Sequence, residues 1–388
     1  MKYAIILFGV LLLWSTASQA VMLVEKQRFE IAEFTTENGH RIAPVQVGWE
    51  AYGELNSNKD NVILITHFFS GTSHAAGKYH ENDPAPGYWD AIIGPGKAID
   101  TDRYYVISVD TLVNANVYDP NVITTGPATI NPATGKPWGL SFPVVTIGDF
   151  VEVQKALLDS LGIEKLHAVI GASMGSFQAI EWATRYPDKV ERLVPVIGSA
   201  FMDAWAGVRL ERWAYPIKQD PAWNQGDYYS TGQPEQGLIT ALSYIIQDAV
   251  HPTGFNLRYP APSSEQALHQ DITASLSAWQ QLRQHAAVRA EFQDANHILY
   301  LVRASQLFRA GMGDDWQKAL ANVQASTLFM PATGDQLLLP AMSQKSRDIM
   351  QQANKTVDYI EIPGIWGHLD GVVGMAAVAQ ELAEFLNN

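Results

Sequence analysis

A serine in a tight turn of small residues is the feature of this sequence with the clearest capacity for chemistry. Residues 171–175 are Gly-Ala-Ser-Met-Gly, with Ser173 at the centre. An apolar run at 166–170 precedes them, and a helical pattern at 176–186 follows them. The order strand, G-x-S-x-G and helix is typical of a nucleophile elbow, which holds the serine hydroxyl clear of the backbone beside a helix N-terminus. This context favours a nucleophile over a chance match in a glycine-rich loop.

A serine hydroxyl becomes a nucleophile only with a base to take its proton and a carboxylate to orient that base. In doubly wound hydrolases the acid follows the serine along the chain, and the histidine comes last. Asp335 and His368 have this order, and each lies just past its own expected strand, where such sheets place their chemistry. We therefore predict a catalytic triad of Ser173, Asp335 and His368. Asp370 is an alternative acid and the weaker choice, because it follows the base in the sequence.

The tetrahedral intermediate of acyl transfer needs two backbone N–H donors for its oxyanion. Met174, directly after the serine, supplies one, and Phe69, in the loop after the expected strand 62–67, is the candidate for the other. Phe68, Phe69 and Trp366 flank the inferred site and suggest an apolar substrate pocket, although aromatic side chains there are equally consistent with core packing.

Three histidines, His67, His74 and His80, cluster at and beyond the end of the same expected strand. Their spacing matches no helical metal-ligand motif, and carboxylates do not accompany them at defined intervals. The sequence contains no cysteine, which excludes a disulfide, a thiolate nucleophile and a cysteine-ligated metal. We therefore predict chemistry that needs neither a metal nor another cofactor.

Short, nearly continuous apolar runs bounded by turn residues predict strands that are buried on both faces. These runs lie at 45–52, 62–67, 104–109, 167–172, 193–197, 327–332 and 357–362. Helical patterns lie between several of them, at 147–161, 177–186, 340–352 and 375–386. The alternation predicts an α/β fold with a mostly parallel, doubly wound sheet and helices on both sides.

One segment interrupts this alternation. From about 202 to 315 the strand signal is weak, and helical stretches are expected at 237–249, 265–282 and 295–309. Because the strand pattern resumes at 327, an insertion is a better interpretation than a separate helical domain. We predict a core formed by 21–200 and 316–388, with residues 201–315 forming a helical cap over the carboxyl ends of the strands.

The first twenty residues have the pattern of a signal peptide. Lys2 is followed by an apolar stretch at 4–14, and small or polar residues lead to a cleavage site after Ala20. An uncleaved anchor is the alternative, but the apolar stretch is short for a membrane span, and no later stretch is long enough. We expect an exported protein, periplasmic or secreted, whose mature form does not enter a membrane.

The formal net charge of −14 argues against nucleic acids and anionic membrane surfaces as partners. The apolar fraction of 47% is ordinary for a globular enzyme. The partner that remains is a small-molecule ester.

Several motifs together resemble the homoserine O-acetyltransferase family of the α/β-hydrolase superfamily. They include Gly-Tyr-Trp-Asp at 87–90, the run at 93–104, Thr-Gly-Pro at 125–127 and Ile-Asn-Pro at 130–132, and in the elbow helix Gln178, Glu181 and Trp182. The similarity covers nearly all of the chain after residue 20. It implies the same triad, the same two oxyanion donors and a helical cap through which members often form homodimers.

The chain also departs from the family pattern. Members usually carry Asp directly after the catalytic histidine, where it meets the substrate amino group. This chain has Leu369 there and Asp370 one step further, so Asp370 is a candidate substrate contact. The family run Asn-x-Leu-Gly-x-Cys is replaced at 114–118 by Asn-Ala-Asn-Val-Tyr. Arg212 is the candidate for the cap arginine that grips the substrate carboxylate, although its flanking residues differ.

These observations are weighed for two enzyme functions, hydrolysis and acyl transfer, and for one function without catalysis. Export and Leu369 favour a carboxylic-ester hydrolase, because the acyl-CoA donor used by the cytosolic transferases would not normally be met outside the cytoplasm. The whole-chain resemblance favours an O-acyltransferase that passes the acyl group to an alcohol. A non-catalytic binding protein on this fold fits poorly with the ordered triad.

Overall fold

The computed structural model of this protein describes residues 21–262, 264–313 and 315–388. The expected signal peptide at 1–20 lies outside these residues. Across the described ranges, no helix has both the length and the apolar character needed to cross a membrane.

A single eight-stranded sheet forms the centre of the fold. Its strands, in spatial order, are β1 (Gln27–Ile31), β4 (Val45–Tyr52), β8 (Tyr105–Val109), β5 (Val62–Thr66), β11 (Leu166–Ala172), β12 (Val190–Val196), β13 (Ser326–Phe329) and β14 (Val357–Tyr359). β4 is antiparallel to both of its neighbours, and the remaining pairs are parallel. The mostly parallel α/β sheet predicted from the sequence is therefore confirmed. The sequence pattern did not predict β1, because its side chains are largely exposed at the sheet edge.

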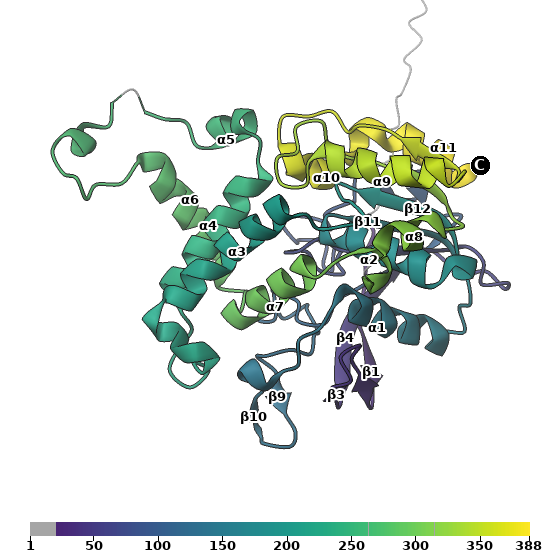
Figure 1. Cartoon of the computed structure of the whole chain (residues 1–388), viewed down its shortest axis with the longest axis horizontal. Helices are drawn as coiled ribbons and strands as arrows, with labels where there is room; N and C mark the ends of the chain where they lie inside the picture. The colour runs from purple at the N-terminus through teal and green to yellow at the C-terminus, as the bar shows by residue number, and fades with distance from the viewer. Residues whose placement is uncertain (1–20, 263, 314) are drawn as a thin grey trace, which may run out of the picture.

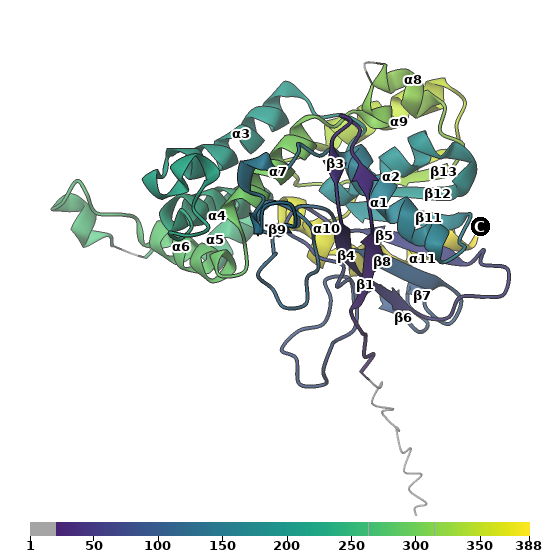
Figure 2. The same cartoon turned by 90° about the horizontal axis from the view of Figure 1, so that it is seen from below.

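Helices cover both faces of the sheet (Figure 2). α1 (Ile147–Ser160), α2 (Met174–Arg185) and α9 (Pro340–Gln352) contribute buried side chains to one apolar cluster. α11 (Ala379–Asn387) packs into the other, with Trp89. A capping box starts α1, in which the Thr146 hydroxyl and the Asp149 carboxylate each accept the other residue's N–H.

Between β12 and β13, the described residues form six α-helices. They are α3 (Ala204–Gln219), α4 (Glu235–Ala249), α5 (Pro252–Arg258), α6 (Ser277–Ala290), α7 (Ala295–Gln306) and α8 (Trp316–Ala321). Both views show α3 to α7 gathered at one end of the sheet, with the segment between α5 and α6 reaching furthest out (Figures 1 and 2). Of these helices, α3 and α4 place apolar side chains around the residue that follows the carboxyl end of β11.

Two helix expectations in this region are wrong. The helix expected at 265–282 begins only at Ser277, because the Asp271 side chain accepts hydrogen bonds from the N–H and hydroxyl of Thr273 and forms a turn there. Conversely, α3 was missed although its buried residues recur at helical spacing, because Pro216 lies inside it. The helix expected at 375–386 also begins later, at Ala379, after a short 3₁₀ turn.

A buried ionic cluster joins the N-terminal segment to the sheet. The Lys26 ammonium lies 2.8 Å from Glu50 and 3.3 Å from Asp110, and both carboxylates are fully buried. Glu50 also accepts a hydrogen bond from Tyr79 at 2.7 Å, and its carboxylate lies 3.0 Å from His74 Nδ1. Because each buried charge has a partner, the cluster stabilises the fold only while Glu50 is ionised.

The stability of the protein should fall with Glu50 protonation. Burial alone would raise the pKa of Glu50, but the His74 hydrogen bond and the Lys26 charge outweigh it and lower the pKa from 4.5 to about 2. A lowered folded-state pKa contributes stability that is complete above pH 4.5 and is lost as the pH falls toward 2. The full loss is roughly 3 kcal/mol. Urea unfolding at several pH values measures it.

The matched variants are Glu50→Gln and, as a control at an exposed position of β1, Glu30→Gln. In the control, the free energy of unfolding should fall at low pH as it does in the wild-type protein. In Glu50→Gln this decrease should be mostly absent. An unchanged pH dependence of stability in Glu50→Gln would show that this cluster does not cause the loss of stability at low pH.

Candidate functional site

Ser173 forms the whole connection between β11 and α2. The strand ends at Ala172 and the helix begins at Met174, so one residue reverses the chain, with φ 56° and ψ −120°. A positive φ is costly for a residue with a side chain and persists only where neighbouring contacts enforce it. Here the Ser173 N–H donates to the carbonyl of Val196 at 2.9 Å, which ties the turn to the end of β12.

Glycines on both sides of Ser173 let the turn pack against β5. A Cβ on Gly175 would lie 2.0 Å from the carbonyl oxygen of Thr66, and a Cβ on Gly171 would lie 2.1 Å from the Thr66 hydroxyl. That hydroxyl donates to the Gly175 carbonyl at 2.7 Å. The small residues of the motif are therefore required by contact with the neighbouring strand.

Ser173, His368 and Asp335 form an unbroken chain of hydrogen bonds. His368 Nε2 lies 2.8 Å from Ser173 Oγ, and His368 Nδ1 lies 2.7 Å from Asp335 Oδ2. The second oxygen of Asp335 accepts the N–H groups of Leu337 at 2.8 Å and Leu338 at 3.0 Å. The carboxylate is thus fixed in place, so that Nδ1–H donates to it and leaves Nε2 free to take the serine proton.

Asp335 and His368 come from the loops that follow β13 and β14, as the sequence order predicts. Asp370, the alternative acid, is not part of the chain, which corrects that expectation and its expected substrate contact. Its carboxylate accepts the N–H groups of Trp366 at 3.0 Å and Gly367 at 2.8 Å and so holds the loop that carries His368. Burial, opposed by these hydrogen bonds, raises the pKa of Asp370.

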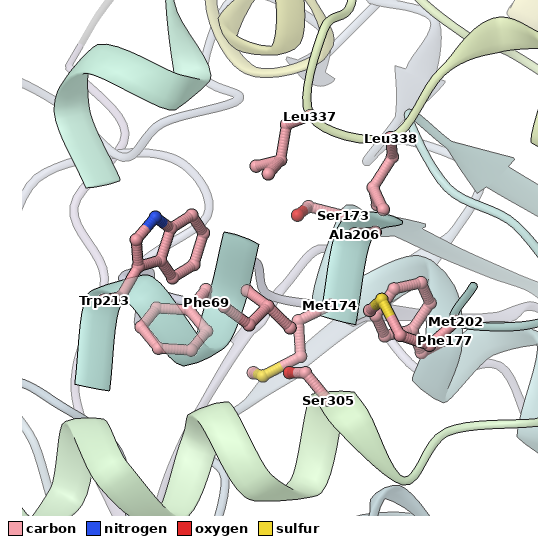
Figure 3. A pocket seen from close by; sticks show the side chains of 11 residues that line it. Phe69, Ser173, Met174, Phe177, Met202, Ala206, Trp213, Ser305, Leu337 and Leu338 are labelled. Atoms are coloured by element: carbon pink, nitrogen blue, oxygen red, sulfur yellow. The ribbon is translucent and has the colours of Figure 1, made fainter. Parts of the chain in front are cut away.

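The two expected oxyanion donors lie on the same side of Ser173. Phe69 and Met174 line one small cavity with it (Figure 3). The Met174 N–H belongs to the first residue of α2 and has no helical acceptor. Within the part of the chain that the structure describes, the Phe69 N–H also donates to no other residue. Both groups can therefore donate to an oxyanion formed beside Ser173.

This small cavity is narrow and almost entirely apolar. It is lined by Phe69, Ser173, Met174, Phe177, Met202, Ala206, Leu210, Trp213, Ser305, Leu337 and Leu338. Its free volume of about 20 Å³ holds roughly one group the size of a water molecule or a methyl. Ser305 contributes a buried hydroxyl that has no partner among the described residues.

A second, larger cavity of about 520 Å³ opens from the other side of Ser173. Core residues Phe68, Leu369, Val372 and Val373 line one wall, and cap residues Trp213, Ile245, Ile246, Arg258, Tyr259, His285 and Arg289 line the other. The serine hydroxyl therefore lies where a small, methyl-sized cavity and a large, mostly apolar cavity meet.

Two expected substrate contacts lie elsewhere. The Arg212 guanidinium pairs with Asp248, which also binds Arg209 at 2.8 Å, and it lines neither cavity. Trp366 packs against Gly254 of α5 and lines neither cavity. Arg212 was expected to bind the substrate because the buried carboxylate of Asp248, on α4, had not been considered as its partner. Phe68, the remaining aromatic candidate, does line the large cavity.

The histidine cluster at 67–80 does not converge on one point. His67 is fully buried, and its Nε2 accepts the N–H of Thr111 at 3.1 Å. Burial lowers the pKa of the ring. His74 contacts Glu50, and His80 lies beside Asp83. His67 therefore anchors the start of the loop that carries Phe69.

The sequence analysis missed two residues that hold this loop. Asn114 donates to the carbonyl of Gly71 at 3.0 Å, and Asn116 donates to the carbonyl of Ser70 at 3.2 Å. Asn116 also accepts from Gln293 at 2.9 Å, which links the loop to the cap. The replacement of the family run at 114–118 had marked this segment, but only the fold brings it beside Phe69.

Comparisons with known proteins agree with this geometry. The family model described as alpha/beta hydrolase fold matches residues 94–370. A homoserine O-acetyltransferase of Deferribacter desulfuricans is 36% identical over 342 residues, which cover 87% of this chain and 88% of that protein. The crystal structure of esterase E22 is 56% identical with a TM-score of 0.92, covering 94% of this chain and all of that one.

A third similar protein is the homoserine O-acetyltransferase from Bacillus anthracis. Its crystal structure is 38% identical with a TM-score of 0.92 and covers 95% of this chain and 99% of that chain. The predicted fold and the resemblance noted in the sequence are thereby confirmed. The relatives include both acetyltransferases and an esterase.

Loss of the Asn116 amide should slow the chemistry at Ser173 through the position of Phe69. Asn116→Ala leaves the Ser70 carbonyl and the Gln293 amide without their partner, so the loop relaxes and the Phe69 N–H moves. We expect kcat on p-nitrophenyl acetate to fall by about 10- to 100-fold, with little change in KM. Asn38→Ala, at an exposed position, is the control and should keep wild-type kcat. An unchanged kcat in a folded Asn116→Ala protein would exclude this positioning role.

Proposed function

We propose that this chain, which belongs to the homoserine O-acetyltransferase family within the α/β-hydrolase superfamily, is a serine-dependent carboxylic-ester hydrolase. The observation that carries the proposal is the hydrogen-bonded chain Ser173–His368–Asp335, which ends at a serine lying between two cavities. One cavity suits a short acyl group and the other a larger leaving group.

In the first half of the reaction, Ser173 Oγ attacks the ester carbonyl carbon while His368 Nε2 takes the hydroxyl proton. The negative charge that forms on the carbonyl oxygen is stabilised by the N–H groups of Phe69 and Met174. Asp335 stabilises the imidazolium without accepting its proton. When the tetrahedral intermediate collapses, the ester C–O bond breaks and His368 gives its proton to the leaving alcohol.

In the second half, water enters from the large cavity and attacks the acyl-enzyme. His368 Nε2 takes a proton from the water, and a second tetrahedral intermediate forms in the same oxyanion site. The bond to Ser173 Oγ then breaks, the serine regains its proton from His368, and a carboxylic acid leaves. The free enzyme is regenerated with no cofactor consumed.

The size of the small cavity supports a short acyl group. The oxyanion donors and the serine position the acyl carbon at the entrance of a space of about 20 Å³. A methyl group fits there, whereas a longer chain must displace packed residues such as Leu210 and Leu338. Displacing well-packed core atoms typically costs about 1–3 kcal/mol, so acetate esters should react fastest.

Leu369 supports hydrolysis over transfer to homoserine. It lines the large cavity directly after the base, at the position where family members usually carry Asp. An apolar side chain there offers no counter-charge to an ammonium group. The 56% identity with esterase E22 points the same way. We also propose export, because of the pattern at 1–20, and an exported enzyme would have water rather than acyl-CoA and homoserine as its common reactants.

The second candidate function is O-acyl transfer of the homoserine O-acetyltransferase type. The names of the curated relatives, including the protein of Deferribacter desulfuricans at 36% identity, favour it. Both functions form the same acyl-enzyme and differ only in whether water or an alcohol removes the acyl group.

Removal of the serine hydroxyl should abolish activity. Ser173→Ala deletes the attacking atom, so kcat/KM on p-nitrophenyl acetate should fall on the order of 10⁴-fold or more. Ser141→Ala, at an exposed serine, is the control and should match the wild-type protein. Wild-type turnover in a Ser173→Ala protein would show that the nucleophile lies elsewhere.

A carboxylate at position 369 should shift the fate of the acyl group toward homoserine. In Leu369→Asp the new charge beside His368 can pair with the homoserine ammonium, so the ratio of O-acetylhomoserine to free acetate should rise at least about 10-fold. The products are separated by chromatography, with acetyl-CoA or p-nitrophenyl acetate as the donor. Val373→Asp, at an exposed position of the same cavity, is the control.

The wild-type protein decides between the two functions in the same assay. Mostly free acetate is the result expected of a hydrolase. Efficient formation of O-acetylhomoserine by the wild-type protein would replace the hydrolase proposal with the transferase.

A further inference from the structure

The large cavity has a positively charged end. Arg258 of α5 and Arg289 of α6 line it together with Tyr259 and His285. Both helices belong to the cap (Figure 1). The rest of the lining, from Phe68 and Leu369 through Trp213 to the α4 residues, is largely apolar. The two arginines therefore line the space that would hold the leaving group.

The charge of this pair is not neutralised by the described part of the chain. There, no Asp or Glu oxygen lies within 4.0 Å of either guanidinium, whereas the neighbouring cap arginines Arg209 and Arg212 both pair with Asp248. The chain has a net charge of −14, so carboxylates are plentiful. Their absence beside Arg258 and Arg289 leaves two like charges facing one hollow.

The two arginines also affect each other. Both arginines are exposed to solvent over part of their side chains, but the surrounding protein partly desolvates the Arg289 guanidinium. This desolvation, and after it the like charge of Arg258, lowers the pKa of Arg289. The Tyr259 hydroxyl lies 2.8 Å from His285 Nδ1, which adds a fixed polar group to the same end. A bound anion would relieve the repulsion and replace the lost solvation.

We propose that the Arg258–Arg289 end of the large cavity binds a carboxylate or phosphate carried by the leaving portion of the ester substrate. The inference rests on the proposed function and deepens it, since it names the class of ester. The anionic group belongs to the leaving portion because the small cavity, which suits the acyl group, has room for only about 20 Å³. Planar guanidinium groups bind both anions through paired N–H donors.

Three acetate esters with matched leaving groups test the subsite. They are 4-acetoxybenzoate, its neutral methyl ester, and 4-acetoxyphenyl phosphate. Each is assayed with the wild-type protein, Arg258→Gln, Arg289→Gln and the control Arg303→Gln, which removes one positive charge from an exposed position of α7. Comparing each variant with the wild-type protein on the same ester cancels differences in leaving-group reactivity.

Arg289→Gln and Arg258→Gln should lower kcat/KM on a charged ester by about 10- to 100-fold, mainly through KM, and change the neutral ester less than about twofold. The ester that suffers the loss identifies the anion as carboxylate, phosphate or both. The loss should shrink at high salt. Equal losses on charged and neutral esters, no loss on either charged ester, or the same loss in Arg303→Gln would overturn the subsite.

Arg289→Lys keeps the charge and the stem of the side chain but loses the planar fork. Arg289→Lys should recover part of the lost kcat/KM on the charged ester. It also keeps the test valid where Arg289→Gln folds poorly. Full recovery together with an unchanged salt dependence would still support an anion site, whereas no recovery in a folded Arg289→Lys protein would contradict it.

Binding without turnover separates this proposal from the proposed function. Isothermal titration of Ser173→Ala with 4-hydroxybenzoate and with phenyl phosphate measures the subsite alone, and adding Arg289→Gln should weaken the tighter of the two by about 10-fold or more. If binding depends on Arg289 but the wild-type protein hydrolyses none of the esters, only the proposed function is overturned. Hydrolysis of the neutral ester without such binding would overturn the subsite alone.

Discussion

The one-residue turn at Ser173 is the constraint on which the rest of the site depends. Its positive φ is enforced by the hydrogen bond to Val196 and by the contact of Gly171 and Gly175 with Thr66. These contacts fix the hydroxyl relative to three parallel strands at once. Because β13 and β14 end at the same edge of the sheet, their loops can bring Asp335 and His368 to that hydroxyl without any distortion of the sheet.

The cap and the core divide the site between them. Core loops supply the nucleophile, the base, the acid and the oxyanion donors, so their geometry depends on the sheet. The cap supplies Met202, Ala206 and Leu210 to the small cavity and Arg258 and Arg289 to the large one. Substrate preference can therefore change through the cap while the reacting groups stay in place. The Asn116–Gln293 contact is one point at which the two parts are tied together.

Residues with a fixed relation to strand ends were predictable from the sequence. Ser173 and Asp335 each follow a buried apolar strand, and His368 follows the half-buried edge strand β14. A parallel sheet brings such positions together whatever the details of packing. The sheet itself was predictable because its central strands are continuous apolar runs. The edge strand β1 was not, because its exposed side chains leave no such run.

Contacts made between distant segments were not predictable in the same way. Arg212 looked available until α4 placed Asp248 against it, and Asp370 looked like an acid until the loop placed backbone N–H groups around its carboxylate. The helix α3 was hidden by Pro216, whose cost is met by tertiary packing of Leu210 and Trp213. Arg258 and Arg289 lie thirty-one positions apart, and only the packing of α5 and α6 brings them to one cavity.

The central claim is that Ser173 carries the acyl group during turnover. Rapid quenching after mixing with p-nitrophenyl acetate, followed by peptide mass mapping, tests it most directly. The account predicts one acetyl group on the peptide that contains Ser173, formed with the burst of p-nitrophenol and lost at the rate of steady-state turnover. An acetyl group on another residue, or turnover with no acetylated peptide at any time, would contradict it.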